Sequence, residues 1–166
     1  MTTPGFEEFV TTRSPALLRT AFLLCGGDRT AAEDLLQDVL ERVYPKWRRI
    51  KDNPESYVRA ALANGAANRW RSRSRRVAEV PLTDAAPPAV RGPEQSVADH
   101  DLVVRALAAL PPRMRAVLVL RYFDDLSEVD TAAALRCGVG TVKSQTSRGL
   151  TRLRELLDGT ELAATS

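Results

Sequence analysis

The chain has 166 residues, room for one ordinary domain or two small ones, and 44% of them are hydrophobic, close to the globular norm. Aromatic residues make up only 5%, which favours packed helices over sheets. A single histidine, two distant cysteines and the lack of a glycine-rich phosphate loop exclude a histidine-dependent hydrolase, a disulfide framework and a structural zinc site.

These exclusions set the expected class of protein. We expect no catalytic residues, no metal and no cofactor, and so no enzyme. No apolar run exceeds about six residues, too short to span a bilayer, so no membrane insertion is expected. The N-terminus lacks the basic and apolar regions of a signal peptide, and a cytoplasmic protein is the expectation.

Charge is unevenly distributed along the chain. The net charge is +3, but the first 76 residues carry 14 Lys and Arg against 9 Asp and Glu. The densest basic stretch is residues 69–76, with five arginines around Trp70. A basic helix end placed against the helix dipole, or a solvated tail, is the simpler interpretation. Clustered arginines that match phosphate geometry favour binding of a polyanion.

The first segments are predicted to be helical. Ser14-Pro15 resembles a helix start, and Gly26-Gly27 supplies a stop. Residues 30–33 form a capping box that opens the next helix, whose wide apolar stripe predicts burial against a core. Pro45 is expected to end or kink that helix near Tyr44.

A third helix and a linker follow. After the basic connector 48–53, Pro54 begins a helix that is expected to reach about Arg76, with Gly65 a weak point inside it. Residues 77–95 hold four of the ten prolines and are acidic, which predicts an interdomain linker. Extended, that linker reaches at most about 60 Å, roughly 18 base pairs of DNA.

The remaining chain is predicted to hold four more helices. The first runs from Ser96 to the Pro111-Pro112 stop, and the second covers residues 113–123. A short helix over 127–135, a turn at 136–139 and a helix over about 140–157 are typical of a helix-turn-helix. Its second helix offers polar residues where recognition helices meet DNA, although an ordinary helical hairpin shows the same pattern. These polar residues are Thr141, Lys143, Ser144, Gln145, Ser147 and Arg148.

The fold class is therefore expected to be all-α. Two small helical domains, residues 1–77 and 96–160, are joined by the proline-rich linker 78–95, and the C-terminal domain is a helix-turn-helix. We also expect the acidic linker to weaken DNA binding by the free protein.

Four motifs in order resemble one family. They are residues 34–38 (DLLQD), 54–76, 110–117 with 125–127, and 139–149. Together they are similar to the extracytoplasmic-function sigma factors of bacterial RNA polymerase, in the sigma-70 family and of the SigE-like actinobacterial type. The resemblance implies a subunit that directs promoter-specific initiation by binding core polymerase and the −10 and −35 elements.

The resemblance also implies residue roles and partners. The partners are core polymerase (β′ clamp and β subunit), promoter DNA and an anti-sigma factor. Polymerase-binding residues are Asp34, Gln37, Asp38 and Glu41. Residues for the −10 element are Tyr57, Asn64, Asn68, Trp70, Arg71 and Arg73. Residues for the −35 element are Arg121, Thr141, Lys143, Ser144, Gln145 and Arg148.

Several of these roles have alternatives. The carboxylates of Asp34, Asp38 and Glu41 are spaced to share one helix face, which is also typical of a merely solvated surface. Asn64 can instead pair with a loop carbonyl, and Trp70 can instead be a core residue.

The chain also departs from the family pattern in the second domain. The family usually has glycine where Arg136 stands, an aliphatic residue at Thr131, and arginine and leucine at Gln145 and Thr146. Other functions compatible with the pattern are a helix-turn-helix regulator that is not a polymerase subunit, and an anti-sigma-like adaptor. The adaptor would not need a basic face, and the regulator leaves the acidic motif unexplained.

Overall fold

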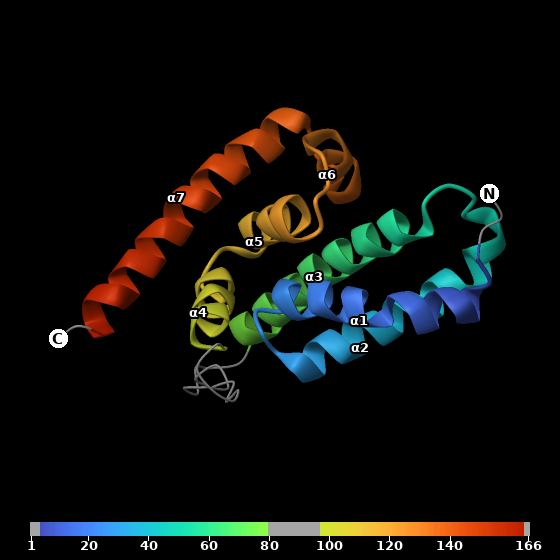
Figure 1. Ribbon diagram of the computed structural model, residues 1–166, viewed down its shortest axis with the longest axis horizontal. Coiled ribbons are helices and arrows are strands. Elements are labelled where there is room, and N and C mark those ends of the chain that lie inside the picture. Colours follow the sequence, from blue (N-terminus) through green and yellow to red (C-terminus); the bar gives the residue numbers. More distant parts are fainter. Residues whose placement is uncertain (1–3, 80–96, 165–166) are drawn as a thin grey trace.

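Every regular element in the described residues, 4–79 and 97–164 of the computed structural model, is helical (Figure 1). This confirms the all-α prediction. No helix among these residues combines the length and apolar character needed to cross a bilayer. The first half contains α1 (Phe6–Leu24), α2 (Arg29–Val43), the 3₁₀ helix η1 (Tyr44–Arg49) and α3 (Pro54–Glu79). The second half contains α4 (Val97–Ala108), α5 (Pro112–Leu118), the π-helical turn η2 (Val119–Phe123), α6 (Glu128–Leu135) and α7 (Val139–Ala164).

Two predicted helix starts in the first half are wrong. Helix α1 begins at Phe6 and continues through Pro15, which is exposed and leaves one helical hydrogen bond unmade because proline has no amide hydrogen. Helix α2 begins at Arg29 because the Asp28 side chain caps it, accepting a 3.0 Å hydrogen bond from the Ala31 amide. The Gly26-Gly27 stop is confirmed, with both glycines at positive φ.

Helix α3 packs against α1 and α2, and one glycine sets how close it comes to α2. A β-carbon at Gly65 would lie 2.8 Å from Leu35 Cδ1, so this position admits no larger residue without a shift of Leu35. Sequence reasoning marked Gly65 as a weak point of the helix. The structure shows the compensating gain, since the small residue lets α2 and α3 approach and bury Leu35 and Val39.

The helix-turn-helix is formed by α6 and α7. Ser127 caps α6 by accepting a 3.0 Å bond from the Asp130 amide, as predicted. Helix α6 then ends in a Schellman motif, with the Cys137 amide donating to Ala132 O and the Arg136 amide to Ala133 O. Arg136 itself adopts the left-handed conformation, with φ 54° and ψ 46°. The turn therefore keeps its geometry without the usual glycine.

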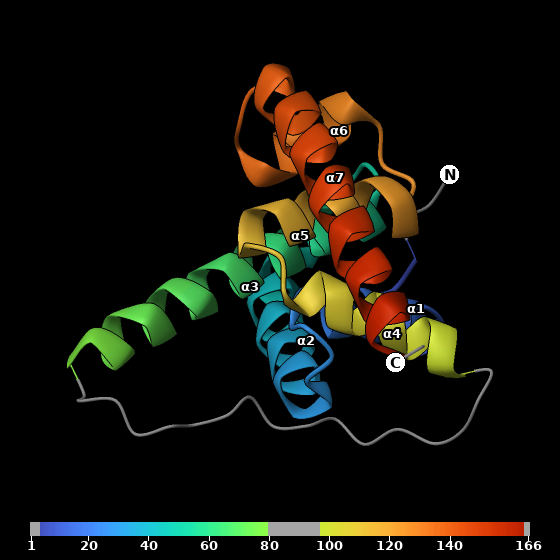
Figure 2. The same ribbon diagram turned by 90° about the vertical axis from the view of Figure 1, so that its left-hand side faces the viewer.

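The two halves pack against each other rather than standing apart (Figure 2). Helix α3 contacts α5 and α6, and α1 contacts α4, α5 and η2. One hydrophobic core runs through both halves and includes Leu24 and Leu62 from the first and Leu107 and Leu118 from the second. Helix α3 extends to Glu79, past the predicted linker start at residue 78. The rest of that linker, with the predicted Ser96 cap, lies outside the described residues.

Candidate nucleic-acid interface

The arginine-rich end of α3 forms a projecting basic arm. Figure 2 shows the C-terminal part of α3 extending away from the bundle, and Arg71, Arg73 and Arg75 on it are exposed. Trp70 is 49% exposed, so the alternative that it is a core residue is wrong. Exposed arginines beside an exposed indole can meet phosphates and stack on bases.

Asn64 lies earlier on α3 and is already engaged. Its Nδ2 donates to the carbonyl of Ala60, one turn back, at 2.9 Å and to the carbonyl of Ala134, in the last turn of α6, at 2.7 Å. Asn64 therefore pairs with carbonyls, but both belong to helices and neither is the loop carbonyl of the alternative prediction. Tyr57 and Asn68 are exposed on the same helix.

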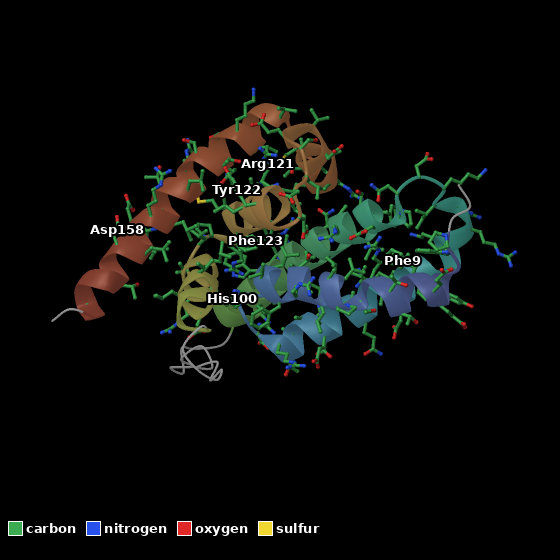
Figure 3. The ribbon with its side chains drawn as sticks, viewed as in Figure 1. Phe9, His100, Arg121, Tyr122, Phe123 and Asp158 are labelled. Carbon is green, nitrogen blue, oxygen red and sulfur yellow. The ribbon has the colours of Figure 1, made fainter. Side chains whose placement is uncertain are left out.

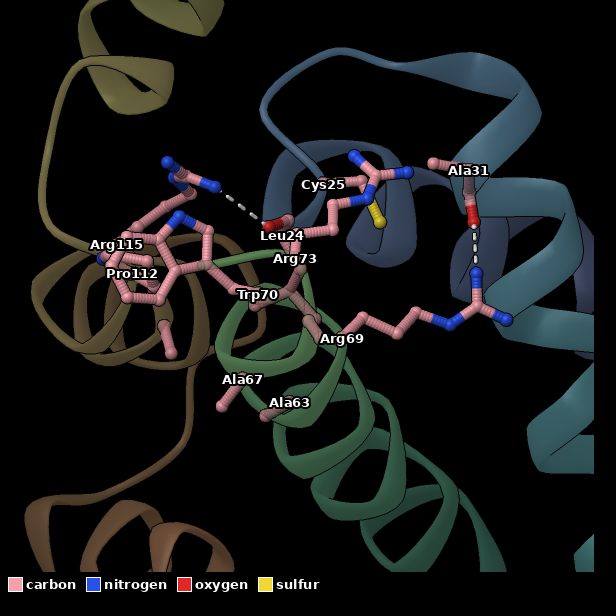
Figure 4. Close-up of a pocket in the computed structure, with 12 residues that line it drawn as sticks. Leu24, Cys25, Ala31, Ala63, Ala67, Arg69, Trp70, Arg73, Pro112 and Arg115 are labelled. Atoms are coloured by element: carbon pink, nitrogen blue, oxygen red, sulfur yellow. Dashed lines mark hydrogen bonds between the residues drawn. The ribbon is translucent and has the colours of Figure 1, made fainter. Parts of the chain in front are cut away.

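A pocket at the root of the basic arm holds a thiol among arginines (Figure 4). Cys25 lies there with Arg69, Arg73 and Arg115. Burial raises the pKa of the Cys25 thiol to about 11, against the weaker opposing effect of the nearby arginines.

Arg115 in this pocket is a structural rather than a DNA-contacting arginine. Its guanidinium is buried and donates to the carbonyl of Leu24 at 3.1 Å. Its other bonds go to carbonyls at the end of α4, namely those of Leu107, Ala108 and Leu110. Arg115 therefore caps the C-terminal ends of α1 and α4 together.

The helix-turn-helix presents a polar face at the start of α7. Val142 and Ala132 are buried where α7 meets α6 and α5, which fixes the helix by its apolar side. Thr141, Lys143 and Ser144 are exposed. Lys143 reaches Glu128 of α6 at 3.8 Å, a loose surface ion pair that a phosphate can displace.

Two of the predicted −35 residues, Arg121 and Gln145, are half-buried rather than exposed. Arg121 is half-buried and its Nη1 donates to Leu126 O at 2.6 Å, so it braces the loop before α6. Gln145 is half-buried, and its Oε1 has no hydrogen-bond partner among the described residues. Of the other departures, Thr146 bonds back to Val142 O at 2.7 Å. Thr131 is fully buried, and its hydroxyl has no hydrogen-bond partner in the part of the chain that the structure describes.

Some of the predicted −10 residues lie opposite some of the predicted −35 residues. Asn64 and Arg71 of α3 line the same cavity as Thr141 and Gln145 of α7. A second, more open groove brings Trp70 of α3 together with Arg148 of α7. The structure thus gathers residues of both sets at the contact between the halves.

The acidic residues of α2 form a second candidate surface of the first half. Asp34, Gln37 and Glu41 are exposed, and Gln37 donates to Glu41 at 3.1 Å. Gln37 and Glu41 border an apolar groove between α1 and α2, whose other lining residues are Phe6, Glu7, Leu18, Glu33, Leu36, Leu40 and Tyr44.

Asp38 is turned away from this groove. It forms an ion pair with Arg69 of α3 and is only half exposed. The expected single row of carboxylates is therefore divided, with Glu41 at the groove and Asp38 at the root of the basic arm. Gln37 and Glu41 thus border the groove and Asp38 lies at the root of the basic arm, while Asp34 is exposed outside both.

Sequence reasoning missed the polar residues that join the halves. Thr20, Arg59 and Asp124 meet in a buried cluster, although 104 positions separate Thr20 from Asp124 in the chain. No local pattern marks these residues, because each lies in a segment whose spacing indicates only an amphipathic helix or a loop.

Comparisons with known proteins agree with this architecture. A family model described as Sigma-70 region 2 matches residues 9–76, and one described as Sigma-70, region 4 matches residues 100–153. The RNA polymerase sigma-E factors of Streptomyces avermitilis and Streptomyces coelicolor are each 40% identical over 161 residues. These matches cover 96% of this chain and 88% and 89% of those proteins, respectively. A solved structure of the sigma factor RpoE with the anti-sigma factor NepR from Bartonella quintana has a TM-score of 0.72 and 28% identity. It covers 92% of this chain and 96% of that chain.

Proposed function

The chain belongs to the sigma-70 family of RNA polymerase sigma factors, in its extracytoplasmic-function group, and from this membership we propose how its surfaces divide promoter recognition. Residues 1–77 dock on core polymerase and read and melt the −10 element. Residues 96–160 grip the −35 duplex, and residues 78–95 connect them. The observation that carries this division is the separation of charge, with exposed acidic residues of α2 beside the groove between α1 and α2 and an arginine-rich arm on α3.

The polymerase-docking surface is the groove between α1 and α2. Its apolar floor supplies area to bury, and the exposed Glu41 and Gln37 at its edge supply orientation and polar contacts. Asp34 extends this surface. Asp38 forms an ion pair with Arg69, and this pair joins the docking helix α2 to the DNA-reading helix α3.

The −10 element is single-stranded when it is read, and α3 has the side chains for that task. Asn64 offers both a donor and an acceptor to an extruded base, while Trp70 and Tyr57 offer stacking surfaces. Arg71 and Arg73 track the phosphates, and Asn68 lies one turn beyond Asn64.

The −35 element is double-stranded, and α7 meets it as a recognition helix. Thr141, Lys143 and Ser144 lie at its N-terminal turn, and Gln145 and Arg148 lie on the next turn. Arg121 acts by holding the loop that leads into α6.

No residue of the protein is assigned a catalytic role, because the polymerase performs the chemistry of RNA synthesis. The protein is expected to act in the cytoplasm, where the template and the polymerase are. Because the RpoE relative was solved with an anti-sigma factor, an anti-sigma partner is also expected for this chain.

An in vitro transcription assay with bacterial core polymerase tests this division. Glu41→Arg should weaken core binding at least tenfold and reduce promoter-dependent initiation accordingly, because it reverses a charge at the edge of the docking groove. Asp158→Arg, the same reversal at an exposed position on α7, is the matched control and should bind as the unaltered chain does. Unaltered core binding by a Glu41→Arg protein of normal helicity would contradict the assignment.

A further inference from the structure

A buried polar cluster joins the two halves beside the shared apolar core. The carboxylate of Asp124, at the end of η2, is only 4% exposed and forms an ion pair with Arg59 of α3. It also accepts a 2.8 Å hydrogen bond from the hydroxyl of Thr20 on α1. Arg59 donates to Thr20 Oγ1 at 3.0 Å and pairs with Glu55 at 2.6 Å. Asp124 is therefore the second half's contribution to a cluster built by the first half.

Two further contacts close the same junction. Arg115 donates across it to Leu24 O, and Asn64 donates across it to Ala134 O. The backbone turn after α1 also fits tightly under α4, since a β-carbon at Gly27 would lie 2.7 Å from Val104 Cγ1. Hydrogen bonds and close packing together hold one defined arrangement of the halves.

This arrangement is incompatible with a protein spanning a promoter. Elements named −35 and −10 lie about 25 base pairs apart, roughly 85 Å along B-DNA. Asn64 and Arg71, assigned to the −10 element, line one cavity with Thr141 and Gln145, assigned to the −35 element. The side-chain amide of Asn64 also donates to Ala134 O. The free chain has to separate its halves before both sets of residues can meet one DNA molecule.

We propose that the cluster of Thr20, Arg59 and Asp124 is a latch that keeps the free protein closed, with Asn64 held at the junction until the halves separate. The significance of Asn64 for DNA reading rests on the proposed function. The latch itself rests only on the contacts across the junction.

The chemistry of the cluster suits a latch that opens. Burial raises the pKa of Asp124, against the opposing effects of Thr20 and Arg59, so enclosing this carboxylate is costly. One of its oxygens, Oδ2, has no partner among the described residues. A buried ion pair adds little net stability because desolvation offsets attraction, and both groups recover water when the halves part. Apolar contacts between the halves supply the attraction that keeps the chain closed. The cluster makes closure depend on an intact ion pair between Arg59 and Asp124.

The test combines small-angle scattering with DNA binding by the full chain. Asp124→Arg places two cations together and should open the halves, raising the radius of gyration by several Å above the value of about 15 Å expected for a compact chain of this length. In fluorescence anisotropy with a labelled single-stranded DNA of mixed sequence, the same variant should bind at least fivefold tighter than the control.

The control is Asp158→Arg, which adds the same charge on the outward part of α7, away from α1 and α3 (Figure 3). The charge swap Arg59→Glu with Asp124→Arg should restore the compact size and the weak DNA binding. Thr20→Val, an uncharged change of similar volume, removes one bond to Asp124 and should open the chain partially, which keeps the test valid if Asp124→Arg fails to fold.

Each possible outcome either supports or overturns the proposed latch. A radius of gyration that is unchanged in well-folded Asp124→Arg and Thr20→Val overturns the latch, whatever the outcome of the transcription assay. An opened chain that binds DNA no better than Asp158→Arg overturns the link between closure and DNA reading. Opening with tighter binding, reversed by the charge swap, supports the proposal.

Discussion

Single residues in this protein show how burial changes chemistry without creating a catalytic site. Arg115 is a buried cation whose hydrogen-bond partners are backbone carbonyls, and burial lowers its pKa. Cys25 lies in the same pocket, where desolvation outweighs the nearby positive charges. Both residues serve the packing of helix ends.

The reactivity of Cys25 provides a direct check. With a pKa of about 11, only about one thiol in a thousand is ionised at pH 8, whereas a free cysteine is about one-quarter ionised. In a Cys137→Ser background, iodoacetamide should therefore alkylate Cys25 more than 100-fold more slowly than free cysteine. Mass spectrometry across pH 8–10 should show the rate rising about tenfold per pH unit. The same protein in urea is the control, and a rate that levels off below pH 9 would contradict this assignment.

At the scale of elements, the turn between α6 and α7 shows tertiary packing outweighing a local backbone preference. The Schellman motif at the end of α6 requires a left-handed residue, and the chain uses Arg136 there instead of glycine. A residue with a β-carbon in this conformation costs about 1–3 kcal/mol, part of which the buried Ala132 and Val142 offset by packing. The motif is preserved because tertiary packing outweighs the local preference.

Relief of this backbone strain should be measurable. Arg136→Gly is expected to raise the free energy of unfolding by about 1 kcal/mol, the gain from removing the β-carbon less the added entropy of the unfolded glycine. Urea denaturation monitored by circular dichroism gives the value. Arg136→Ala keeps the β-carbon while removing the charge, and should bring no comparable gain. If the alanine variant matched the glycine variant, the strain would not lie in the backbone.

At the scale of the whole molecule, the junction couples two helical units into one core. Leu24 and Leu62 belong to the same buried cluster as Leu107 and Leu118, so opening the junction exposes apolar surface on both sides. Any separation of the halves therefore has to overcome this loss of buried apolar surface.

Cooperative unfolding tests this coupling. The unaltered chain should unfold in a single calorimetric transition, with the calorimetric and van't Hoff enthalpies equal, because neither half keeps its core surface covered alone. Asp124→Arg should separate the transition into two or lower the van't Hoff value below the calorimetric one. Asp158→Arg should keep the single transition. Two transitions in the unaltered chain would show that the halves are energetically independent.

The local structure could be predicted wherever one short segment contained the whole signal. The Ser127 cap, the Gly26-Gly27 stop, the Pro54 start and the order of helices all follow from residues a few positions apart. The two errors at helix starts have the same local scale, since Asp28 competed with the predicted cap and Pro15 was tolerated on an exposed turn.

By itself, then, the sequence determined the helices, the helix-turn-helix and the family, because capping, periodicity and motif order are properties of neighbouring residues. Only the tertiary structure decided that Asn64 pairs with Ala134, that Asp38 pairs with Arg69, and that Arg59 meets Asp124. The residues in these pairs lie 31 to 70 positions apart. Whether such residues meet depends on how whole helices pack, and helix packing is set by the shape of the shared core rather than by any local pattern.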